Sequence, residues 1–152
     1  MKKQRIYIDT SVVGGCLDDE FREESCALFE MARRGEVVLL TSTILFTELE
    51  DAPPPVQDTL RSLPRSAIED VAEGSESERL RDLYVEAGVV GESSLDDAHH
   101  VALAVVSRAD VIVSWNFKHI VNLSRIRGYN AVNIREGYSP VEIRTPKEVI
   151  GT

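Results

Sequence analysis

Short runs of uninterrupted apolar residues, separated by longer amphipathic stretches, are the feature that most constrains how this chain can fold. Val37–Leu40 is apolar throughout, and Val111–Ser114 is apolar up to its last residue. Strands with apolar residues on both faces are typical of parallel sheets that helices cover on each side. The pattern therefore predicts β-α-β units with right-handed crossovers, and an α/β domain with a central, mostly parallel sheet.

The expected elements follow one another in a regular order along the chain. Gly35, Gly88 and Gly128 each end an expected helix, because glycine readily adopts the left-handed conformation that closes one. The expected strands are Arg5–Asp9, Val37–Leu40, Ile68–Val71 at a sheet edge, Val111–Ser114 and Ala131–Ile134. The expected helices are Phe21–Arg34, one capped by Thr41 or Ser42 that runs through Leu49, Val56–Leu63 after three prolines, Ser75–Ala87, one that begins near Ser94, and Lys118–Arg127. The alternating tail Val141–Arg144 precedes a final turn opened by Pro146.

The length and the charge of the chain narrow the classes of function. A chain of 152 residues is the usual size of one domain, so residues 1–152 are expected to form a single domain. The formal net charge of −9 argues against a protein that coats phosphate backbones, because that affinity comes from cationic side chains that displace counterions. Nucleic-acid chemistry at a metal site is not excluded, since the cation supplies the positive charge.

The sequence also favours an intracellular, cytoplasmic protein without a membrane segment. The apolar run after the basic start, Ile6–Ile8, ends at Asp9 and is far shorter than the core of a signal peptide. No apolar stretch approaches the length that spans a bilayer. Cys16 and Cys26 are interpreted as reduced thiols that act as small apolar residues.

Four polar residues stand where an α/β sheet places its ligands, beyond the carboxyl ends of its strands. Asp9 ends the first expected strand, and Asn116 follows Val111–Ser114. Glu48 lies about two turns into one helix, and Asp97 lies in the first turn of another. Each also has an ordinary explanation, because Asp9 can form a turn, Glu48 can be an exposed helical glutamate, and Asp97 can be a capping residue.

Clustered carboxylates raise one another's pKa unless a cation neutralises them. Mg²⁺ or Mn²⁺ is the natural solution, because hard cations take oxygen ligands and Mg²⁺ keeps several waters. Such an ion stabilises charge on a transferring phosphoryl group, while carboxylates orient a water for attack. The constellation therefore indicates metal-assisted hydrolysis of a phosphodiester.

Several segments resemble the PIN-domain family. Ile8–Ser11 is similar to the opening motif of that family, and Phe46–Leu49 to its second acidic motif. Asp97–Ala104 is similar to its Asp-Ala-x-His-x-Ala-x-Ala helix start, and Val111–Ile120 to the segment that carries its last acidic position. The resemblance runs from Ile6 to about Ile134, and the order and spacing of the motifs are its most specific part.

The resemblance implies a three-layer α/β/α fold and a metal-dependent endoribonuclease, often the toxin of a VapC-type toxin–antitoxin pair. By that likeness Asp9, Glu48 and Asp97 would hold Mg²⁺ or Mn²⁺, directly or through water, with Asn116 beside them. Ser11 and Ser114 would support these ligands. The likeness also implies an RNA substrate, a homodimer and a small antitoxin partner.

Asn116 departs from the family pattern, which has an acid there. An amide oxygen brings no charge, so the affinity for a cation should fall. A second hypothesis is therefore a catalytically weakened PIN-like module that acts through a protein or RNA partner. A third is a receiver-like or other doubly wound domain that uses Asp9 for phosphoryl chemistry.

Residues beside the acidic positions carry further expectations. Trp115 is interpreted as a packing anchor at the strand end, with a base-stacking platform as the alternative. Lys118 and His119 either contact a phosphate backbone or form the surface of a helix start. His100, three residues after Asp97, is expected at the cleft rim and His99 on its flank.

Four arginines are the best candidates for a local basic patch on the surface, and two of them share an expected helix with Lys118. They are Arg33, Arg34, Arg125 and Arg127.

Overall fold

The computed structural model describes residues 2–151 and contains one five-stranded sheet in which every pair of neighbouring strands is parallel. Across the sheet the strands are β3 (Ile68–Val71), β2 (Val37–Ser42), β1 (Gln4–Ile8), β4 (Val111–Val113) and β5 (Glu142–Arg144). The expected parallel sheet is therefore confirmed, with Ile68–Val71 at one edge as the sequence predicted.

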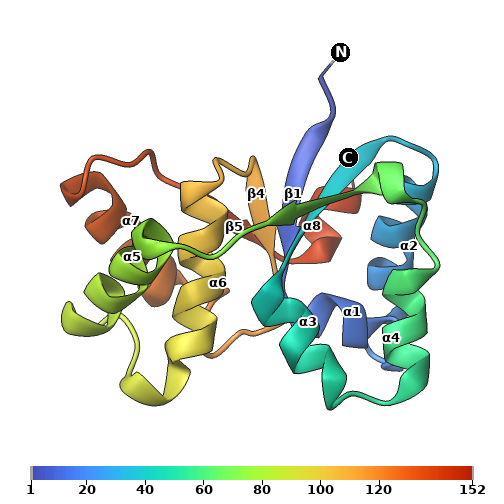
Figure 1. Cartoon of the computed structure of the whole chain (residues 1–152), viewed down its shortest axis with the longest axis horizontal. Helices are drawn as coiled ribbons and strands as arrows, with labels where there is room; N and C mark the ends of the chain where they lie inside the picture. Colours follow the sequence, from blue (N-terminus) through green and yellow to red (C-terminus); the bar gives the residue numbers. More distant parts are fainter. Residues whose placement is uncertain (1, 152) are drawn as a thin grey trace.

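Helices cover both faces of the sheet and give three layers, α/β/α (Figure 1). One face carries α5 (Ser75–Glu86), α6 (Leu95–Val106) and α7 (Leu123–Arg135). The other carries α1 (Thr10–Gly15), α2 (Arg22–Arg33), α3 (Thr43–Glu50), α4 (Pro54–Arg61) and α8 (Pro146–Ile150). Two single turns, η1 (Arg65–Ala67) and η2 (Glu92–Ser94), complete the connections.

Alternation along each strand divides the apolar residues between two cores. Tyr7, Leu40 and Ile112 point to the core beneath α5, α6 and α7. Ile6 and Leu39 point to the core beneath α1, α2 and α4. Because both faces of β1 and β2 are buried, these strands have no polar position in their centres.

The strand order reverses direction beside β1, and this reversal fixes the place of the site. The chain adds β2 and β3 on one side of β1, then β4 and β5 on the other. Ligands of open α/β sheets bind at such a switch point, outside the carboxyl ends of the strands. The order also differs from the 2-1-3-4-5 order of receiver-like folds, so a receiver-like topology is excluded.

Local signals set most of the element ends. Ser42 caps α3, because its hydroxyl accepts a hydrogen bond from the backbone N–H of Leu45 at 3.3 Å. Gly35 and Gly88 follow α2 and α5 with φ of +77° and +76°, as expected for glycines that close helices. Pro54 lies in the first turn of α4, where its missing N–H costs no helical bond.

The expected strand Ala131–Ile134 is wrong, and the helix expected at Lys118–Arg127 begins and ends later in the chain. A single helix, α7, runs from Leu123 through both segments to Arg135. Asn122 caps it by accepting the N–H of Arg125, which leaves Lys118 in the preceding turn.

The buried residues of this segment are spaced as on one face of a helix, and they do not alternate with exposed residues as in a strand. Tyr129, Val132 and Asn133 are buried, whereas Ile134 is exposed. Gly128 lies inside this helix and does not end it. It packs against Val89, whose Cγ1 would be only 2.9 Å from an added Cβ, so the absence of a side chain allows this close contact. β-branched residues in this segment therefore suggested a strand that tertiary packing overrides.

Three smaller differences also separate expectation and structure. The chain forms the helix α1 directly after Asp9, and the alternating tail forms the strand β5. Ser94 precedes α6 as expected, but its side chain makes no capping hydrogen bond.

Cys16 and Cys26 are free, as expected; Cys16 is buried and Cys26 exposed. Within residues 2–151, none of the helices combines the length and the apolar character needed to cross a lipid bilayer.

The close approach of α1 to α2 makes a testable prediction about Gly15. A Cβ on Gly15 would lie 2.5 Å from Ser25 Oγ and 2.8 Å from Trp115 Nε1, whereas one on Gly14 would meet nothing within 4 Å. We expect Gly15→Ala to lower the free energy of unfolding by about 1–3 kcal/mol through overpacking. The matched control Gly14→Ala should raise it by about 0.4–1 kcal/mol. Urea denaturation measures both values, and equal stabilities of the two variants would contradict this packing.

Candidate active site

The carboxylate of Asp9 lies at the switch point between β1 and β4. Register pairs Ile8 with Val113, so the residues that follow each strand, Asp9 and Ser114, leave the sheet side by side. Asp9 is only 4% exposed, and its two carboxylate oxygens each accept a hydrogen bond of 2.6 Å, from Ser11 Oγ and from Ser114 Oγ. The pairing across two strands therefore fixes this carboxylate.

The two serines are themselves held by the backbone after β4. Ser11 Oγ accepts the N–H of Trp115, and Ser114 Oγ accepts the N–H of Asn116, each at 2.9 Å. Each hydroxyl donates its own proton to Asp9, and the two hydroxyl oxygens lie 3.4 Å apart. This geometry agrees with the supporting place that the family resemblance implied for Ser11 and Ser114.

Glu48 approaches the same region from α3 and is half-buried. Its Oε1 accepts hydrogen bonds from Thr10 Oγ1 at 2.6 Å and from His100 Nε2 at 2.7 Å. Burial raises the pKa of Glu48, but the hydrogen bonds from His100 and Thr10 outweigh it, so the pKa lies below its ordinary value. Glu48 therefore carries its negative charge at neutral pH.

His100 is the centre of the site, and not its rim as the sequence suggested. It is 1% exposed, and its Nδ1 lies 2.7 Å from the hydroxyl of Tyr7, which contacts Ser42 Oγ at 2.8 Å. Burial opposes the charged imidazolium, but the hydrogen bond to Glu48 and the charges of Asp9, Glu48 and Asp97 outweigh it and raise the pKa of His100. One imidazole thus senses all three predicted carboxylates.

Asp97, in the first turn of α6, faces Asp9. Burial raises its pKa and the charge of Asp9 raises it further, whereas His119, His100 and a hydrogen bond from Asn116 act against these effects; the pKa remains above its ordinary value. Asp9 itself has a raised pKa, because its burial outweighs the charge of His100 and the two serine hydrogen bonds. Two neighbouring carboxylates with raised pKa values form a site that favours a cation.

Asn116 plays a different part from the one the sequence suggested. Its Oδ1 accepts the backbone N–H groups of Lys118 at 3.2 Å and of His119 at 2.9 Å, so the amide oxygen closes a turn. The Asn116 side chain also acts on Asp97, where it lowers the pKa of the carboxyl. The side chain therefore positions Asp97 and the following turn, and its oxygen is already satisfied.

His119 lies close to the acidic residues, which the sequence did not indicate. Among residues 2–151, its Nδ1 is the buried side-chain polar atom that has no hydrogen-bond partner. The charge of His119 acts on Asp97 more strongly than any other charged group does. Its position three residues after Asn116, in the turn that the Asn116 amide closes, was the available signal. His119 therefore lies near Asp97 with one buried ring nitrogen that makes no hydrogen bond within the described chain.

The donor set suits a hard divalent ion in its chemistry, with three carboxylates and a network of fixed hydroxyls. In the part of the chain that the structure describes, however, no three His, Cys, Asp or Glu side chains converge closely enough to enclose an ion directly. The charge of Asp9 acts on Asp97, and Thr10 and His100 hold Glu48 by hydrogen bonds. This arrangement matches an ion that keeps several waters, bound directly by one or two carboxylates.

Other residues considered from the sequence lie in structural contacts. His99 is buried with its Nε2 3.1 Å from Ser77 Oγ. Arg125 donates to the backbone oxygen of Val89, which ties α7 to the loop before α6. Arg33 and Arg34 form ion pairs with acidic neighbours on and after α2, so these two arginines do not form an unpaired basic patch.

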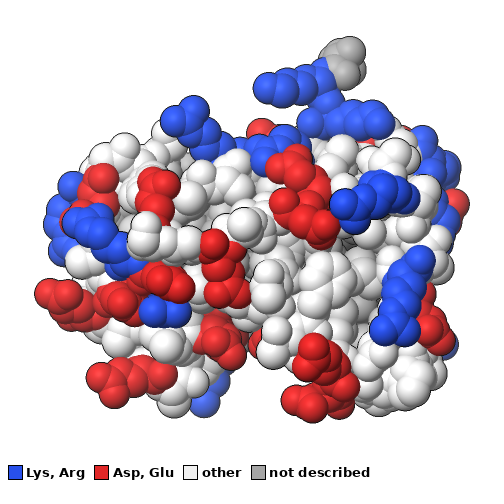
Figure 2. Space-filling view, in the orientation of Figure 1, with Lys and Arg blue, Asp and Glu red and all other residues white. Residues whose placement is uncertain are grey.

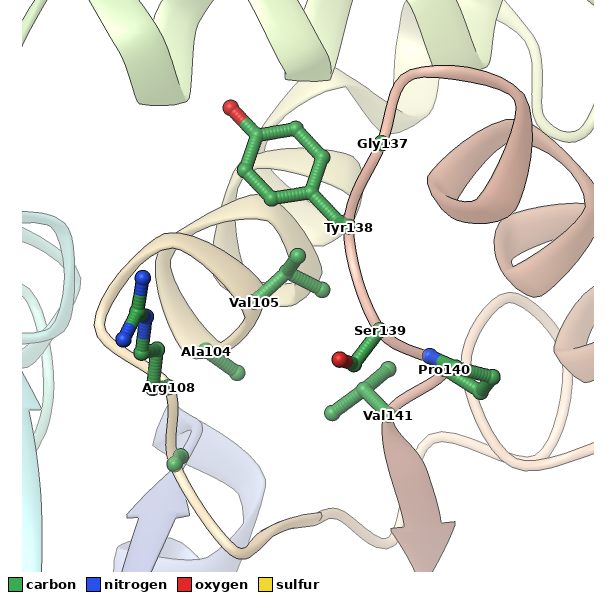
Figure 3. Close-up of a pocket in the computed structure, with 9 residues that line it drawn as sticks. Ala104, Val105, Arg108, Gly137, Tyr138, Ser139, Pro140 and Val141 are labelled. Carbon is green, nitrogen blue, oxygen red and sulfur yellow. The ribbon is translucent and has the colours of Figure 1, made fainter.

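The surface near the site is acidic, like the site itself. In Figure 2 the end of the molecule that carries the carboxyl ends of the strands shows mainly acidic side chains, and basic ones gather at the opposite end. A cavity of about 450 Å³ lies at that opposite end, between the end of α6 and the loop before β5 (Figure 3). It is lined by Val105, Arg108, Tyr138 and Ser139 among others, and it takes no part in the acidic site.

Comparison with known proteins gives one family match. The sequence matches the family profile described as PIN domain over residues 5–118. No curated protein is similar enough in sequence to count as a match.

Two solved structures share the fold. VapBC2 from Rickettsia felis, bound to a DNA fragment from its promoter, aligns with a TM-score of 0.54 and 15% identity over 76% of this chain and 90% of that one. VapC20 from Mycobacterium tuberculosis, described as a toxin that cleaves the sarcin–ricin loop, aligns with a TM-score of 0.51 and 15% identity over 90% of this chain and 98% of that one. At this identity the likeness shows the fold.

The raised pKa of Asp9 predicts a specific cost to stability. An ionised group whose pKa is raised by folding destabilises the folded chain as the pH rises through that pKa, and costs nothing when it is protonated in both states. In EDTA, we expect the stability of Asp9→Asn relative to the wild type to increase from pH 3 to pH 8, because the amide resembles the protonated acid and does not ionise. Urea denaturation at each pH measures this difference, and a difference that does not change with pH would contradict this account.

Proposed function

The chain belongs to the PIN-domain family, and on this premise we propose that it is an endoribonuclease that depends on Mg²⁺ or Mn²⁺. The observation that carries the proposal is the meeting of Asp9, Glu48 and Asp97 around one buried imidazole at the β1–β4 switch point. A cluster of carboxylates is unfavourable unless a cation neutralises it, so such a cluster is typical of a cation-binding site.

Asp9 and Asp97 would hold the ion, with Glu48 reaching it through water. A bound divalent ion supplies Lewis acidity to the scissile phosphate and lowers the pKa of a coordinated water. Ser11 and Ser114 keep the Asp9 carboxylate in one orientation, and His100 and Thr10 do the same for Glu48. In this proposal Glu48, which is ionised at neutral pH, would accept a proton from an attacking water.

The substrate and partners rest on the fold neighbours. VapC20 is described as cleaving the sarcin–ricin loop, which supports RNA as the substrate here. VapBC2 supports an antitoxin partner, and with it the activity of a toxin in the cytoplasm. A homodimer belongs to the same proposal.

A pair of adjacent acids on α6 tests the catalytic proposal. Asp97 is half-buried and faces Asp9, whereas Asp96 is exposed. We expect Asp97→Asn to slow divalent-dependent RNA cleavage by about 100-fold or more and to weaken Mn²⁺ binding measured by calorimetry. The matched control Asp96→Asn should leave both unchanged. If wild-type protein and Asp97→Asn cleave RNA at the same rate in Mg²⁺ and in Mn²⁺, the proposed activity is wrong.

A second candidate function is a weakened module that acts through a partner, and Asn116 is the observation that favours it. The Asn116 amide places no negative charge beside Asp97, and two backbone N–H groups already occupy its oxygen. The affinity for a cation is therefore lower than four acids would give.

The variant Asn116→Asp separates the two candidates. A carboxylate can still accept the N–H groups of Lys118 and His119, but it loses the donor to Asp97 and adds a repulsive charge. We expect the variant to be less stable in EDTA by about 1–3 kcal/mol and to bind Mn²⁺ at least about 10-fold more tightly. A large accompanying gain in cleavage would mark the natural protein as weakened; unchanged cleavage would mark it as a complete enzyme.

A further inference from the structure

The cavity of about 450 Å³ between the C-terminal end of α6 and the loop before β5 has the size of a small-molecule site (Figure 3). Residues of α6 and of the segment 137–141 line it. α6 carries Asp97 in its first turn and Val105 in its last, and at about 1.5 Å per residue the two lie about 12 Å apart along the helix axis. The cavity is therefore separate from the acidic site.

The backbone of Arg108, at the wall of this cavity, is strained. Among residues 2–151, Arg108 is the residue other than glycine with a positive φ, of +58°. Two hydrogen bonds close α6 here, from the N–H of Arg108 to the oxygen of Val105 at 3.1 Å and from that of Ala109 to Ala104 at 3.0 Å. The same pair of bonds closes α2, α5 and α7, where the left-handed position is held by Gly35, Gly88 and Gly137.

A left-handed backbone costs free energy in any residue that carries a Cβ, and for this reason glycine is the usual residue at such a helix end. The chain therefore has an arginine at a position where glycine would fold with less strain. Strained positions of this kind gather at functional sites, so the Arg108 side chain is the part of the residue to explain.

The Arg108 guanidinium has no partner in the described part of the chain, where it forms neither an ion pair nor a hydrogen bond. Arg5, which donates to the Arg108 carbonyl oxygen at 3.0 Å, pairs with Glu69 instead. Asp110, the nearest acid along the chain, accepts the backbone N–H of Arg5 at 2.7 Å. Arg108 therefore brings to the cavity a positive charge that no carboxylate of residues 2–151 binds.

The opposite wall of the cavity supplies a hydroxyl and apolar surface. In Figure 3, Ser139 lies across the cavity from Arg108, with its hydroxyl directed toward the space between them. The Tyr138 hydroxyl donates to Glu76 at 2.6 Å, so Tyr138 offers its ring to the cavity and not a free polar group. Val105 and Val141 add apolar contacts.

This combination matches the two parts of an organic anion. A guanidinium donates paired N–H groups in one plane, which fit a carboxylate or a phosphate, and hydrogen bonds to a charged acceptor are the stronger ones. A cation also stabilises the C-terminal end of a helix. That second effect by itself predicts no binding of a ligand, so a binding experiment separates the two.

We propose that this cavity binds a small organic anion. Arg108 pairs with the phosphate or carboxylate group of the ligand, and Ser139 donates a hydrogen bond from the opposite wall. The apolar or aromatic body of the ligand lies against Val105, Tyr138 and Val141. The inference does not rest on the proposed ribonuclease function, because the cavity and the acidic site share no residue.

NMR spectroscopy of the ¹⁵N-labelled chain tests the proposal, with phenyl phosphate and benzoate as probes. EDTA keeps the acidic site free of divalent ions, so that this site repels both anions. We expect at least one of them to shift the amide signals of Ala109, Ser139 and Val141 with saturation, with a dissociation constant on the order of 1 mM. The tighter of the two identifies the anionic group. Uncharged benzamide, which has the shape of benzoate, should bind at least about 10-fold more weakly. Absence of saturable shifts with both anions, or equal binding of benzamide and the tighter anion, would overturn the inference.

Variants of Arg108 separate a ligand site from a helix end. Arg108→Gly suits the left-handed backbone, so the chain should fold, and it should raise the dissociation constant of the tighter anion about 10-fold or more. Arg108→Lys, which keeps the charge but loses the paired donors, should give an intermediate value. Arg127→Gln removes the same charge from an exposed position on α7 and should change nothing. Equal affinities of Arg108→Gly and Arg127→Gln would overturn the inference and leave Arg108 a role at the helix end alone.

Discussion

The burial of one carboxylate between two strands is the constraint on which the rest of this structure depends. Asp9 leaves β1 where the strand order reverses, and Ser114 leaves β4 beside it, so a hydrogen bond between them joins the two halves of the sheet. An ionised carboxylate in such a place is unfavourable unless it is hydrogen-bonded or neutralised. Both of its oxygens are bonded, yet its pKa remains raised. The fold thus holds a charge that an added cation would stabilise.

His100 explains how the site tolerates three acids before any ion is bound. Its imidazole bonds to Glu48, and the charges of all three carboxylates favour its protonated form. The Tyr7 hydroxyl on its other nitrogen continues to Ser42, which caps α3. The same chain of hydrogen bonds therefore balances charge and fixes the helix that carries Glu48. Stability and function share these groups, which is common where a site is built into a buried core.

The net charge of the protein limits how it would bind RNA in the proposed function. A chain with a formal net charge of −9 does not attract RNA through its general field, so affinity would come from a few local contacts. A cation held by Asp9 and Asp97 would supply one such contact with the phosphate.

The sequence by itself determined the parallel α/β sheet. It also indicated that Asp9, Glu48 and Asp97 lie near the carboxyl ends of its strands. Apolar runs such as Val37–Leu40 can be buried only in a sheet that is covered on both faces, and strand ends then fall together. Tertiary structure alone decided that Ala131–Ile134 continues a helix, because only packing reveals which of its residues are buried. It also decided that His100 lies at the centre and that Asn116 closes a turn. These roles depend on contacts between residues far apart in the chain, and no local pattern in the sequence encodes a distance.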